Sequence, residues 1–387
     1  MERATVESIG VKALSRDQIT EILQKEMNTP AFRAKQVIQW LYGKGVSTYE
    51  EMTNLPKDLR QRLAQELPLL PVTVTKKQVS KDGTRKYLVR MGDGTLVETV
   101  GMPGKNKLCV CVSTQAGCPM RCTFCATGRN GYTRNLGPGE IVDQVRVVAN
   151  DFGTRVSSVV LMGQGEPFLN YDAVLEAMRI LNSKDGFDIG ARHITVSTAG
   201  ILPQIRRFAS EPEQFTLAIS LHSAVQDTRD ELMPGVRQYD LERLRDSVAS
   251  YAEATGRRPT YEYAMMAGIN DSDAQLKALV TFCRRTLCHV NLITLNEVAG
   301  SPFQPSDKER VALFAKTLSA AGVETTIRES RGSDIDAACG QLKQKASPAR
   351  FKRVCLVFQY RIDTKIPRTI ETRTREFFNC YANTSDN

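Results

Sequence analysis

The sequence predicts an α/β protein built around a partial (βα)6 barrel, with a small N-terminal helical domain and a β-hairpin extension. Six short apolar runs follow one another between residues 107 and 297, and most are separated by segments of helical periodicity. This alternation is typical of a parallel sheet covered by helices. Before them, a Gly-Asp-Gly turn at 92–94 joins two strand-like runs, which indicates a hairpin. Segments with helical periodicity and capping residues precede the hairpin in the chain.

We expect residues 1–66 to form an N-terminal helical module that binds RNA, and residues 67–107 to form a linker and the hairpin extension. Ser15 is a good N-cap for the segment "SRDQITEILQKEM". The next helical segment begins at Pro30 and ends at Gly45, as start and stop signals require. The hairpin is predicted in "KYLVRMGDGTLVETV".

The barrel is expected over residues 108–342. Its six predicted strands lie in the runs "KLCVCVS", "SSVVLMG", "HITVSTAG", "FTLAISLHS", "TYEYAMMAG" and "HVNLITLNE". Ligand sites in such folds lie at the carboxyl ends of the strands. The basic segment 343–387 has no clear place in this pattern, and we expect that tail to be partly disordered.

Composition and charge narrow the class of protein. The chain has 387 residues, is 41% hydrophobic and carries a net charge of +9, which suits a folded protein of one large domain with appendages. We find no signal peptide and no apolar run long enough to span a membrane, and we expect a cytoplasmic protein. Residues 1–90 and 341–387 each carry +6, against −3 between them. Basic ends favour binding to a polyanion such as nucleic acid, although solvated surface charge is the alternative.

The segment "GCPMRCTFCATG" places Cys118, Cys122 and Cys125 within eight positions, directly after the first predicted barrel strand. A structural zinc site usually needs four ligands in two separated pairs, and no second pair is found. Electron-transfer clusters usually use four cysteines. Three thiolates leave one iron of a 4Fe-4S cluster open to another ligand. The C-x-x-x-C-x-x-C spacing, with Phe124 before the last cysteine, resembles the signature of radical S-adenosylmethionine (SAM) enzymes. That resemblance implies a 4Fe-4S cluster on the three cysteines, SAM as the cofactor and a radical SAM barrel.

Small and polar residues follow the other predicted strands. They are Gly165 and Glu166 after the second strand, Ser197 after the third, Ser220, Leu221 and His222 after the fourth, and Asn296 after the sixth. Any one of them can be an ordinary strand-end cap. Because the carboxyl ends of the strands meet at one edge, we interpret the set as SAM-binding residues.

A wider resemblance covers residues 15–342. The segments "VETV", "CVSTQAGC", "MGQGEP", "SLHS" and especially "DIDAACGQL" at 334–342 are similar to those of the RlmN/Cfr family of radical SAM RNA methyltransferases. This resemblance implies methylation of C2 of an adenosine in 23S rRNA, with tRNA as a possible second substrate. It also implies an electron donor such as flavodoxin. We expect a monomer that does not bind membranes.

The same resemblance implies roles for three residues outside the cluster. Cys339 takes a methyl group from one SAM molecule, and the radical derived from a second SAM then removes a hydrogen atom from that S-methyl group. The resulting carbon radical adds to C2, an electrophilic carbon without a nucleophilic lone pair. Glu98 acts as the general base that removes the C2 proton. Cys111 then attacks the sulfur of Cys339, and the resulting disulfide releases the methylated base.

Several alternatives stay open. Cys109 lies two residues before Cys111, on the same strand face, and is a rival for the resolving thiol. Gln164 stands where the family commonly has Met, and a polar side chain is therefore expected beside the cofactor. Methylation of C8, as in the Cfr branch, would use the same residues. An iron-sulfur protein that binds RNA or transfers electrons without methylation is a third possibility, but it would not need Glu98, Cys111 or Cys339.

Overall fold

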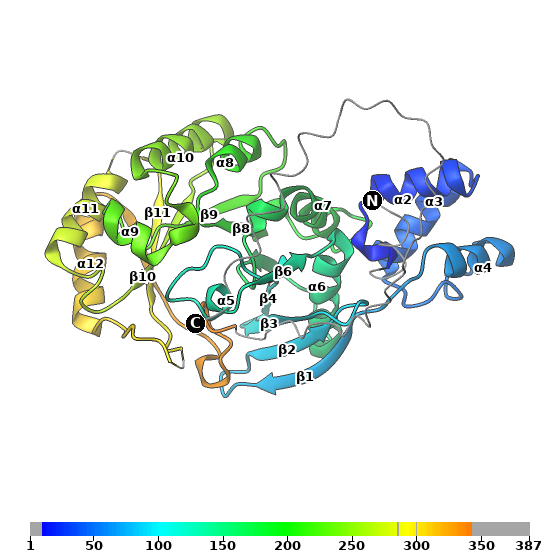
Figure 1. Ribbon diagram of the computed structural model, residues 1–387, viewed down its shortest axis with the longest axis horizontal. Helices are drawn as coiled ribbons and strands as arrows, with labels where there is room; N and C mark the ends of the chain where they lie inside the picture. Colours follow the sequence, from blue (N-terminus) through cyan, green and yellow to red (C-terminus); the bar gives the residue numbers. More distant parts are fainter. Residues whose placement is uncertain (1–9, 285, 299, 343–387) are drawn as a thin grey trace, which may run out of the picture. The chain divides into compact units, whose positions relative to one another are not determined.

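The computed structural model describes residues 10–284, 286–298 and 300–342, and its central feature is a ten-stranded sheet (Figure 1). The strand order is β1-β2-β3-β4-β7-β8-β9-β10-β11-β12. From β4 onward every neighbouring pair is parallel, whereas the first three pairings are antiparallel. The expected disordered tail, with Cys355 and Cys380, lies outside the described residues.

The six predicted barrel strands are confirmed. They are β4 (Lys107–Cys111), β7 (Ser158–Leu161), β8 (Ile194–Thr198), β9 (Thr216–Ser220), β10 (Thr260–Met265) and β11 (His289–Thr294). A further parallel strand, β12 (Glu324–Arg328), pairs with β11 and was not predicted. Its sequence "ETTIR" contains one apolar residue, Ile327, and that side chain is exposed. An exposed edge strand needs no apolar run, so the hydrophobic pattern does not reveal it.

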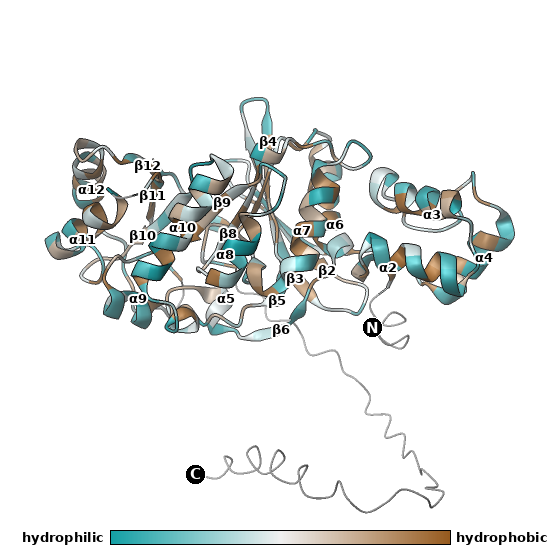
Figure 2. Ribbon diagram, turned by 90° about the horizontal axis from the view of Figure 1, so that it is seen from above, coloured by the Kyte–Doolittle hydropathy of each residue, from teal (hydrophilic) through white to brown (hydrophobic). Residues whose placement is uncertain are grey.

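Helices follow most of the parallel strands and place apolar faces against the sheet, as Figure 2 shows by hydropathy. The connecting helices are α6 (Pro138–Phe152), α7 (Tyr171–Asn182), α8 (Leu202–Phe208), α9 (Gln226–Leu232), α10 (Leu241–Thr255), α11 (Asp273–Cys283) and α12 (Lys308–Ala320). In α7, Val174, Met178 and Leu181 are buried at helical spacing. They belong to one continuous core with strand residues such as Val159 and Val196. Burial of these faces supplies the main stabilisation of the barrel.

The predicted hairpin is confirmed as β2 (Arg85–Arg90) and β3 (Leu96–Gly104), joined by the turn that contains Gly94 at φ +86°. An additional strand, β1 (Thr73–Val79), pairs with β2. Because β3 also pairs with β4, the hairpin extends the same sheet as the barrel. This continuity brings Met102 and Pro103, near the end of β3, to the site described below.

The N-terminal helices are α2 (Arg16–Glu21), α3 (Ala31–Ile38) and α4 (Lys57–Glu66). A 3-10 turn at Val11–Ala13 precedes them, and π-helical segments at Ile22–Glu26 and Gln39–Lys44 continue α2 and α3. Ser15 and Gln18 form a capping box, in agreement with the N-cap predicted at Ser15. The buried ion pair between Lys12 and Asp143, with Nζ and Oδ2 2.7 Å apart, ties this module to α6. No helix in the described residues is both long and apolar enough to cross a bilayer.

The positive charge of the N-terminal third is unevenly placed. Residues 10–66 carry a net charge of +2, whereas residues 67–90 carry +5. Lys76, Lys81 and Arg90 are exposed on or beside the first two strands. The basic surface therefore belongs more to the hairpin extension than to the helices.

Candidate active site

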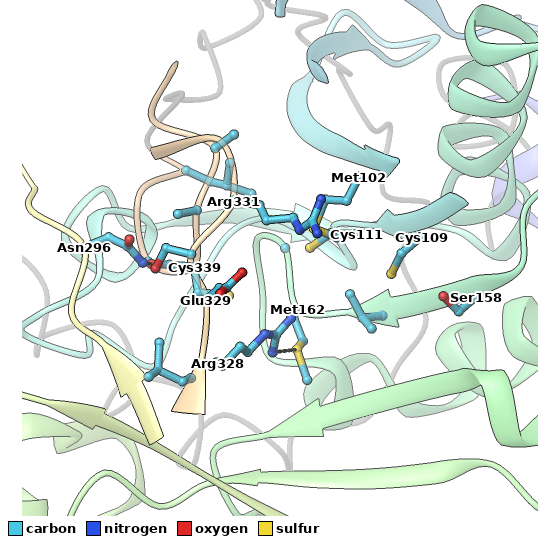
Figure 3. Close-up of a pocket in the computed structure, with 18 of the residues that line it drawn as sticks. Met102, Cys109, Cys111, Ser158, Met162, Asn296, Arg328, Glu329, Arg331 and Cys339 are labelled. Carbon is cyan, nitrogen blue, oxygen red and sulfur yellow. Dashed lines mark hydrogen bonds between the residues drawn. The ribbon is translucent and has the colours of Figure 1, made fainter. Parts of the chain in front are cut away.

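Two adjoining cavities open at the carboxyl ends of the parallel strands. The smaller, about 160 Å³, is lined by Cys118, Cys122 and Cys125 and by residues from the ends of β7 to β11. The larger, about 520 Å³, lies between β4, the end of β12 and the segment that carries Cys339 (Figure 3). Asn296, Arg328 and Cys339 line both cavities. The smaller is the candidate cofactor cavity and the larger the candidate substrate cavity.

The three cysteines lie in a loop that begins after a short extra strand. Cys118 was expected to follow the first barrel strand directly, but β5 (Gln115–Gly117) intervenes and pairs with β6 (Tyr132–Asn135). Gly117 has φ +77°, and a Cβ there would lie 2.1 Å from the carbonyl oxygen of Gly131, so the loop needs glycine at this position. After the loop, α5 (Ala126–Arg129) starts immediately behind Cys125.

The donor set suits an iron-sulfur cluster better than a single metal ion. Within the described ranges, no three His, Cys, Asp or Glu side chains converge on one ion. An iron-sulfur cluster does not require the three thiols to converge on one atom, because each thiolate binds a different iron atom. Burial raises the pKa of the Cys118 thiol to about 12 and that of Cys122 well above its ordinary value. Cysteine binds metal as the thiolate, so cluster assembly would release the protons of these buried thiols.

Most of the predicted SAM-binding residues line the cofactor cavity. These are Gly165, Glu166, Ser197, Ser220, His222 and Asn296. Leu221 does not line it, because its side chain is fully buried in the core. Its main chain runs between two cavity residues, and its N–H donates to the carbonyl of Glu262.

Gly165 and Glu166 shape the wall of this cavity beside the cysteine loop. Gly165 has φ +107°, and a Cβ there would lie 2.7 Å from the Cβ of Gln115. The Glu166 carboxylate accepts from the N–H groups of Phe168 at 3.0 Å and Ala199 at 2.7 Å. Burial raises the pKa of Glu166. Its carboxylate therefore holds two loops together, in addition to facing the cavity.

His222 presents a neutral ring to the same cavity. Its Nδ1 accepts from the N–H of Ala264 at 3.0 Å, so the ring proton lies on Nε2. Burial lowers the pKa of His222 to about 3. The ring of Phe124 meets it edge to face, with centroids 4.8 Å apart. His222 can thus donate a hydrogen bond but remains uncharged near neutral pH.

Cys339 is exposed, and its segment is fastened to both the cysteine loop and the end of β11. The N–H of Ala126 donates to the carbonyl of Gly340 at 2.8 Å, and the Thr127 hydroxyl donates to that of Leu342 at 2.6 Å. Asn296 donates through Nδ2 to the carbonyl of Cys339 at 3.2 Å. These bonds hold the thiol where the two cavities meet.

Cys109 and Cys111 both line the substrate cavity from β4 (Figure 3). Cys111 packs with Ala337 and Leu342, which flank Cys339 in sequence, in a small hydrophobic cluster. Cys109 does not belong to that cluster. The packing favours Cys111 as the nearer partner for Cys339.

Glu98 lines neither cavity. It is buried, and its Oε1 lies 3.2 Å from Nζ of Lys86. Gln164, which we expected beside the cofactor, also lines neither cavity and instead accepts from the N–H of Glu98 at 3.2 Å. The polar replacement in "MGQGEP" thus faces the hairpin, and that expectation was wrong.

Two charged residues of the cofactor cavity were missed from the sequence. Glu262 lies mid-strand in β10, where a charged residue inside an apolar run was an available signal. Its Oε1 accepts from Nδ2 of Asn291 at 3.0 Å, whereas Oε2 has no hydrogen-bond partner. Arg328, on the unpredicted β12, places Nη1 3.8 Å from that Oε2 and donates to the Met162 sulfur. Both side chains line the cofactor cavity.

Comparison with known proteins agrees with this geometry. Residues 112–281 match the Radical SAM superfamily, and residues 10–68 match the ribosomal RNA large subunit methyltransferase N-terminal domain. The chain is 44% identical over 341 residues to the probable dual-specificity RNA methyltransferase RlmN of Alkaliphilus oremlandii, covering 88% of this chain and 99% of that protein. It is 46% identical over 317 residues to the protein of that name from Staphylococcus epidermidis strain ATCC 12228, covering 81% and 87%.

A solved structure supports the same family assignment. The crystal structure of a radical SAM methyltransferase from Sphaerobacter thermophilus matches with a TM-score of 0.80 and 44% identity, over 87% of this chain and 99% of that one. The barrel and its cysteine loop therefore define a radical SAM enzyme, which uses a 4Fe-4S cluster and SAM. More narrowly, the chain belongs to the RlmN family of radical SAM RNA methyltransferases.

Proposed function

We propose that this enzyme methylates C2 of an adenosine in 23S rRNA, and of an adenosine in tRNA, through a methylated cysteine. The observation that carries the proposal is the position of Cys339, which lines both the cofactor cavity and the substrate cavity. A thiol that first receives a methyl group and then delivers it must face both molecules. The name of the relatives, dual-specificity RNA methyltransferase, supports two RNA substrates.

Cys118, Cys122 and Cys125 would hold the cluster, and the cavity residues would orient SAM against it. When bound, cluster and cofactor supply an electrophilic methyl group, a hydrogen-abstracting radical and an acceptor for the electron released later. Each turnover uses two SAM molecules, one for the methyl group and one for the radical. An electron donor such as flavodoxin would supply the electron that begins the radical step.

The remaining chemistry belongs to the protein thiols. Cys339 loses its proton and forms an S–CH3 bond, and that methyl group later gives up one hydrogen atom. Its carbon joins C2 of the adenine, and the adduct becomes aromatic again by losing the C2 proton and one electron. The Cys111 thiolate then attacks the Cys339 sulfur, so that an S–S bond forms and the S–CH2 bond breaks. The electron pair stays on carbon, which takes a proton to become the new methyl group, and an external thiol reduces the disulfide.

Glu98 is the proposed acceptor of the C2 proton. In this structure it is held by Lys86 and does not reach either cavity. Lys86 also donates to the carbonyl of Asp336, three residues before Cys339. For Glu98 to act as the base, the segment that contains Asp336 and Cys339 must shift relative to Lys86 and Glu98 when RNA binds. Such a shift is reasonable because catalytic hydrogen bonds often tighten only in the complex. We further propose that the enzyme acts as a monomer in the cytoplasm, where its RNA substrates are.

Mass spectrometry of nucleosides from RNA treated with the reconstituted enzyme tests this proposal. The expected product is 2-methyladenosine from 23S rRNA and from tRNA. Appearance of 8-methyladenosine would instead support methylation of C8. Turnover of the electron donor with no methylated nucleoside would support an iron-sulfur protein without methyltransferase activity.

A further inference from the structure

Arg229, on α9, is buried without a counter-ion. Its side chain is 1% exposed. Nη2 donates to the carbonyl of Ala199 at 2.6 Å, but neither Nε nor Nη1 has a hydrogen-bond partner. Four other arginines in the described residues have one such nitrogen each, whereas Arg229 has two. An arginine stays protonated in a protein, so these two nitrogens leave three N–H groups of a buried cation without an acceptor.

No acidic side chain within the described part of the chain forms an ion pair with Arg229. The adjacent Asp230 instead accepts from Gln226. Burying an uncompensated charge costs several kcal/mol, and native proteins compensate buried charges by pairing or metal coordination. The environment of Arg229 is therefore complete only when an anion is present.

The surroundings of Arg229 identify where that anion lies. The N–H of Thr123 donates to the carbonyl of Leu232, and the N–H of Gly235 donates to that of Met120. The end of α9 and the following turn thus pack directly against the cysteine loop. Thr123 directly follows Cys122, and Leu232 lies three residues after Arg229 on the same helix, so the two groups lie on segments that are in contact.

We infer that Arg229 is the buried cation that compensates the negative charge of the 4Fe-4S cluster, from the protein side of the cysteine loop. A cubane held by three thiolates is an anion, and its negative charge grows when it accepts an electron. Nε–H and Nη1–H would donate to a cluster sulfide or to the Cys122 sulfur. Net charge and hydrogen bonds to sulfur are the factors that set cluster potentials. Arg229 therefore favours the reduced cluster.

The carboxylate of SAM is the other anion at this site. Arg229 does not line the cofactor cavity, although Ala199, Ser220 and Cys122 do. The guanidinium is therefore covered from the open cavity, and the Cys122 sulfur, on the loop against which α9 packs, is the part of the cluster anion that it faces from the protein side. This role needs no RNA, so it can fail or hold independently of the proposed methyltransferase activity.

The test compares wild type with Arg229→Met and Arg229→Gln, each purified anaerobically with a reconstituted cluster. Both variants remove the charge, and Gln keeps a donor for Ala199 in case the Met variant does not fold. The potential of the cluster, titrated without SAM and followed by electron paramagnetic resonance of the reduced form, should fall. A tenfold weaker preference for the reduced cluster corresponds to about 59 mV for one electron. Arg229→Lys should restore most of the wild-type potential.

The matched control is Arg146→Met. Arg146 also has a buried Nε without a hydrogen-bond partner, but it lies on α6, 4.0 Å from Oδ1 of Asp143, and donates through Nη2 to the carbonyl of Tyr42. This variant should leave the cluster potential unchanged. An unchanged potential in Arg229→Gln would overturn the inference. The same result together with weaker binding of SAM would assign Arg229 to the cofactor carboxylate instead.

Discussion

Lys86 connects Glu98 to the segment that carries Cys339. Its Nζ lies 3.2 Å from Oε1 of Glu98 and 3.0 Å from the carbonyl oxygen of Asp336. Lys86 and Glu98 lie on the two paired strands of the hairpin, whereas Asp336 is about 240 residues further on, and both charged side chains are buried. The hairpin extension thus holds the proposed base and the segment of the proposed methyl-accepting thiol in one arrangement.

Lys86→Met should therefore impair both stability and turnover. Removing one partner of a buried ion pair costs up to roughly 3–5 kcal/mol in free energy of unfolding. We expect a lower denaturation midpoint and slower methylation of RNA than in wild type. Lys277→Met, at an exposed position on α11, is the control and should resemble wild type. Equal stability of the two variants would contradict the structural role of Lys86.

The two thiols should fail at different stages. With Cys339→Ala, neither methylated enzyme nor methylated RNA should form, because the methyl acceptor is missing while the cluster ligands remain. With Cys111→Ala, the methyl group should load and join the base, but the adduct cannot be resolved. Labelled RNA should then migrate with the protein on a denaturing gel.

Cys109→Ala is the control for the resolving thiol, since Cys109 lines the same cavity but lacks the packing of Cys111 against Ala337 and Leu342. It should turn over without trapping RNA. Trapping by Cys109→Ala in place of Cys111→Ala would reverse the assignment.

His222 should make the protein less stable as the pH falls. Its folded pKa is about 3, against 6.5 in the unfolded chain, so between these values only the unfolded state binds the proton. The contribution of the neutral His222 ring to the free energy of unfolding is fully present above pH 6.5. It is lost as the pH falls toward 3, at about 1.4 kcal/mol per pH unit. Urea denaturation of the cluster-free protein at pH 7.5 and 5.5 measures it.

His222→Asn should remove this part of the pH dependence, because Asn tolerates the backbone φ of +55° and does not titrate. His193→Asn, at an exposed position, should retain the wild-type dependence. An identical pH dependence in His222→Asn and wild type would show that His222 is not the titrating group.

The basic hairpin should contribute to RNA binding. Replacing Lys76, Lys81 and Arg90 by Ala should weaken binding and reduce the slope of log affinity against log salt by about 1 for each phosphate that is no longer neutralised. The matched control replaces three exposed lysines on α11 and α12, namely Lys277, Lys308 and Lys316. Filter binding over a series of salt concentrations measures the affinity for RNA and its slope against salt in both triple variants. Equal slopes in the two triple variants would show that the hairpin does not bind RNA phosphates.

Periodicity was sufficient to predict the parallel strands, since each buried strand needs an apolar run. It missed β12, where only Ile327 is apolar and the strand lies at the sheet edge. The spacing of the cysteines and the residues at the strand ends were sufficient to locate the cofactor cavity, because the carboxyl ends of parallel strands lie at one edge of the sheet. No pattern in the sequence indicated that Leu221 faces the core or that Gln164 faces Glu98, since side-chain direction beyond a strand end depends on loop conformation.

Arg229 and Glu262 show a second limit of sequence reasoning. Charged residues usually lie at the surface, so the near-complete burial of Arg229 follows only from the packing of α9 on the cysteine loop. Glu262 was visible as a charge within a strand, but the hydrogen bond of its Oε1 to Asn291 and the ion pair of its Oε2 with Arg328 depend on the neighbours that β11 and β12 supply.

The bond between Lys86 and Asp336 joins positions 250 residues apart, and so does the bond from the N–H of Gly332 to Asp82. Contacts this distant in sequence cannot form until nearly all of the barrel has been synthesised, and closing such long loops is slow. Cys339, the proposed methyl acceptor, is therefore placed in the site late. A nascent or truncated chain that already has its three cluster cysteines would still lack the proposed methyl carrier and could not methylate RNA by the proposed route.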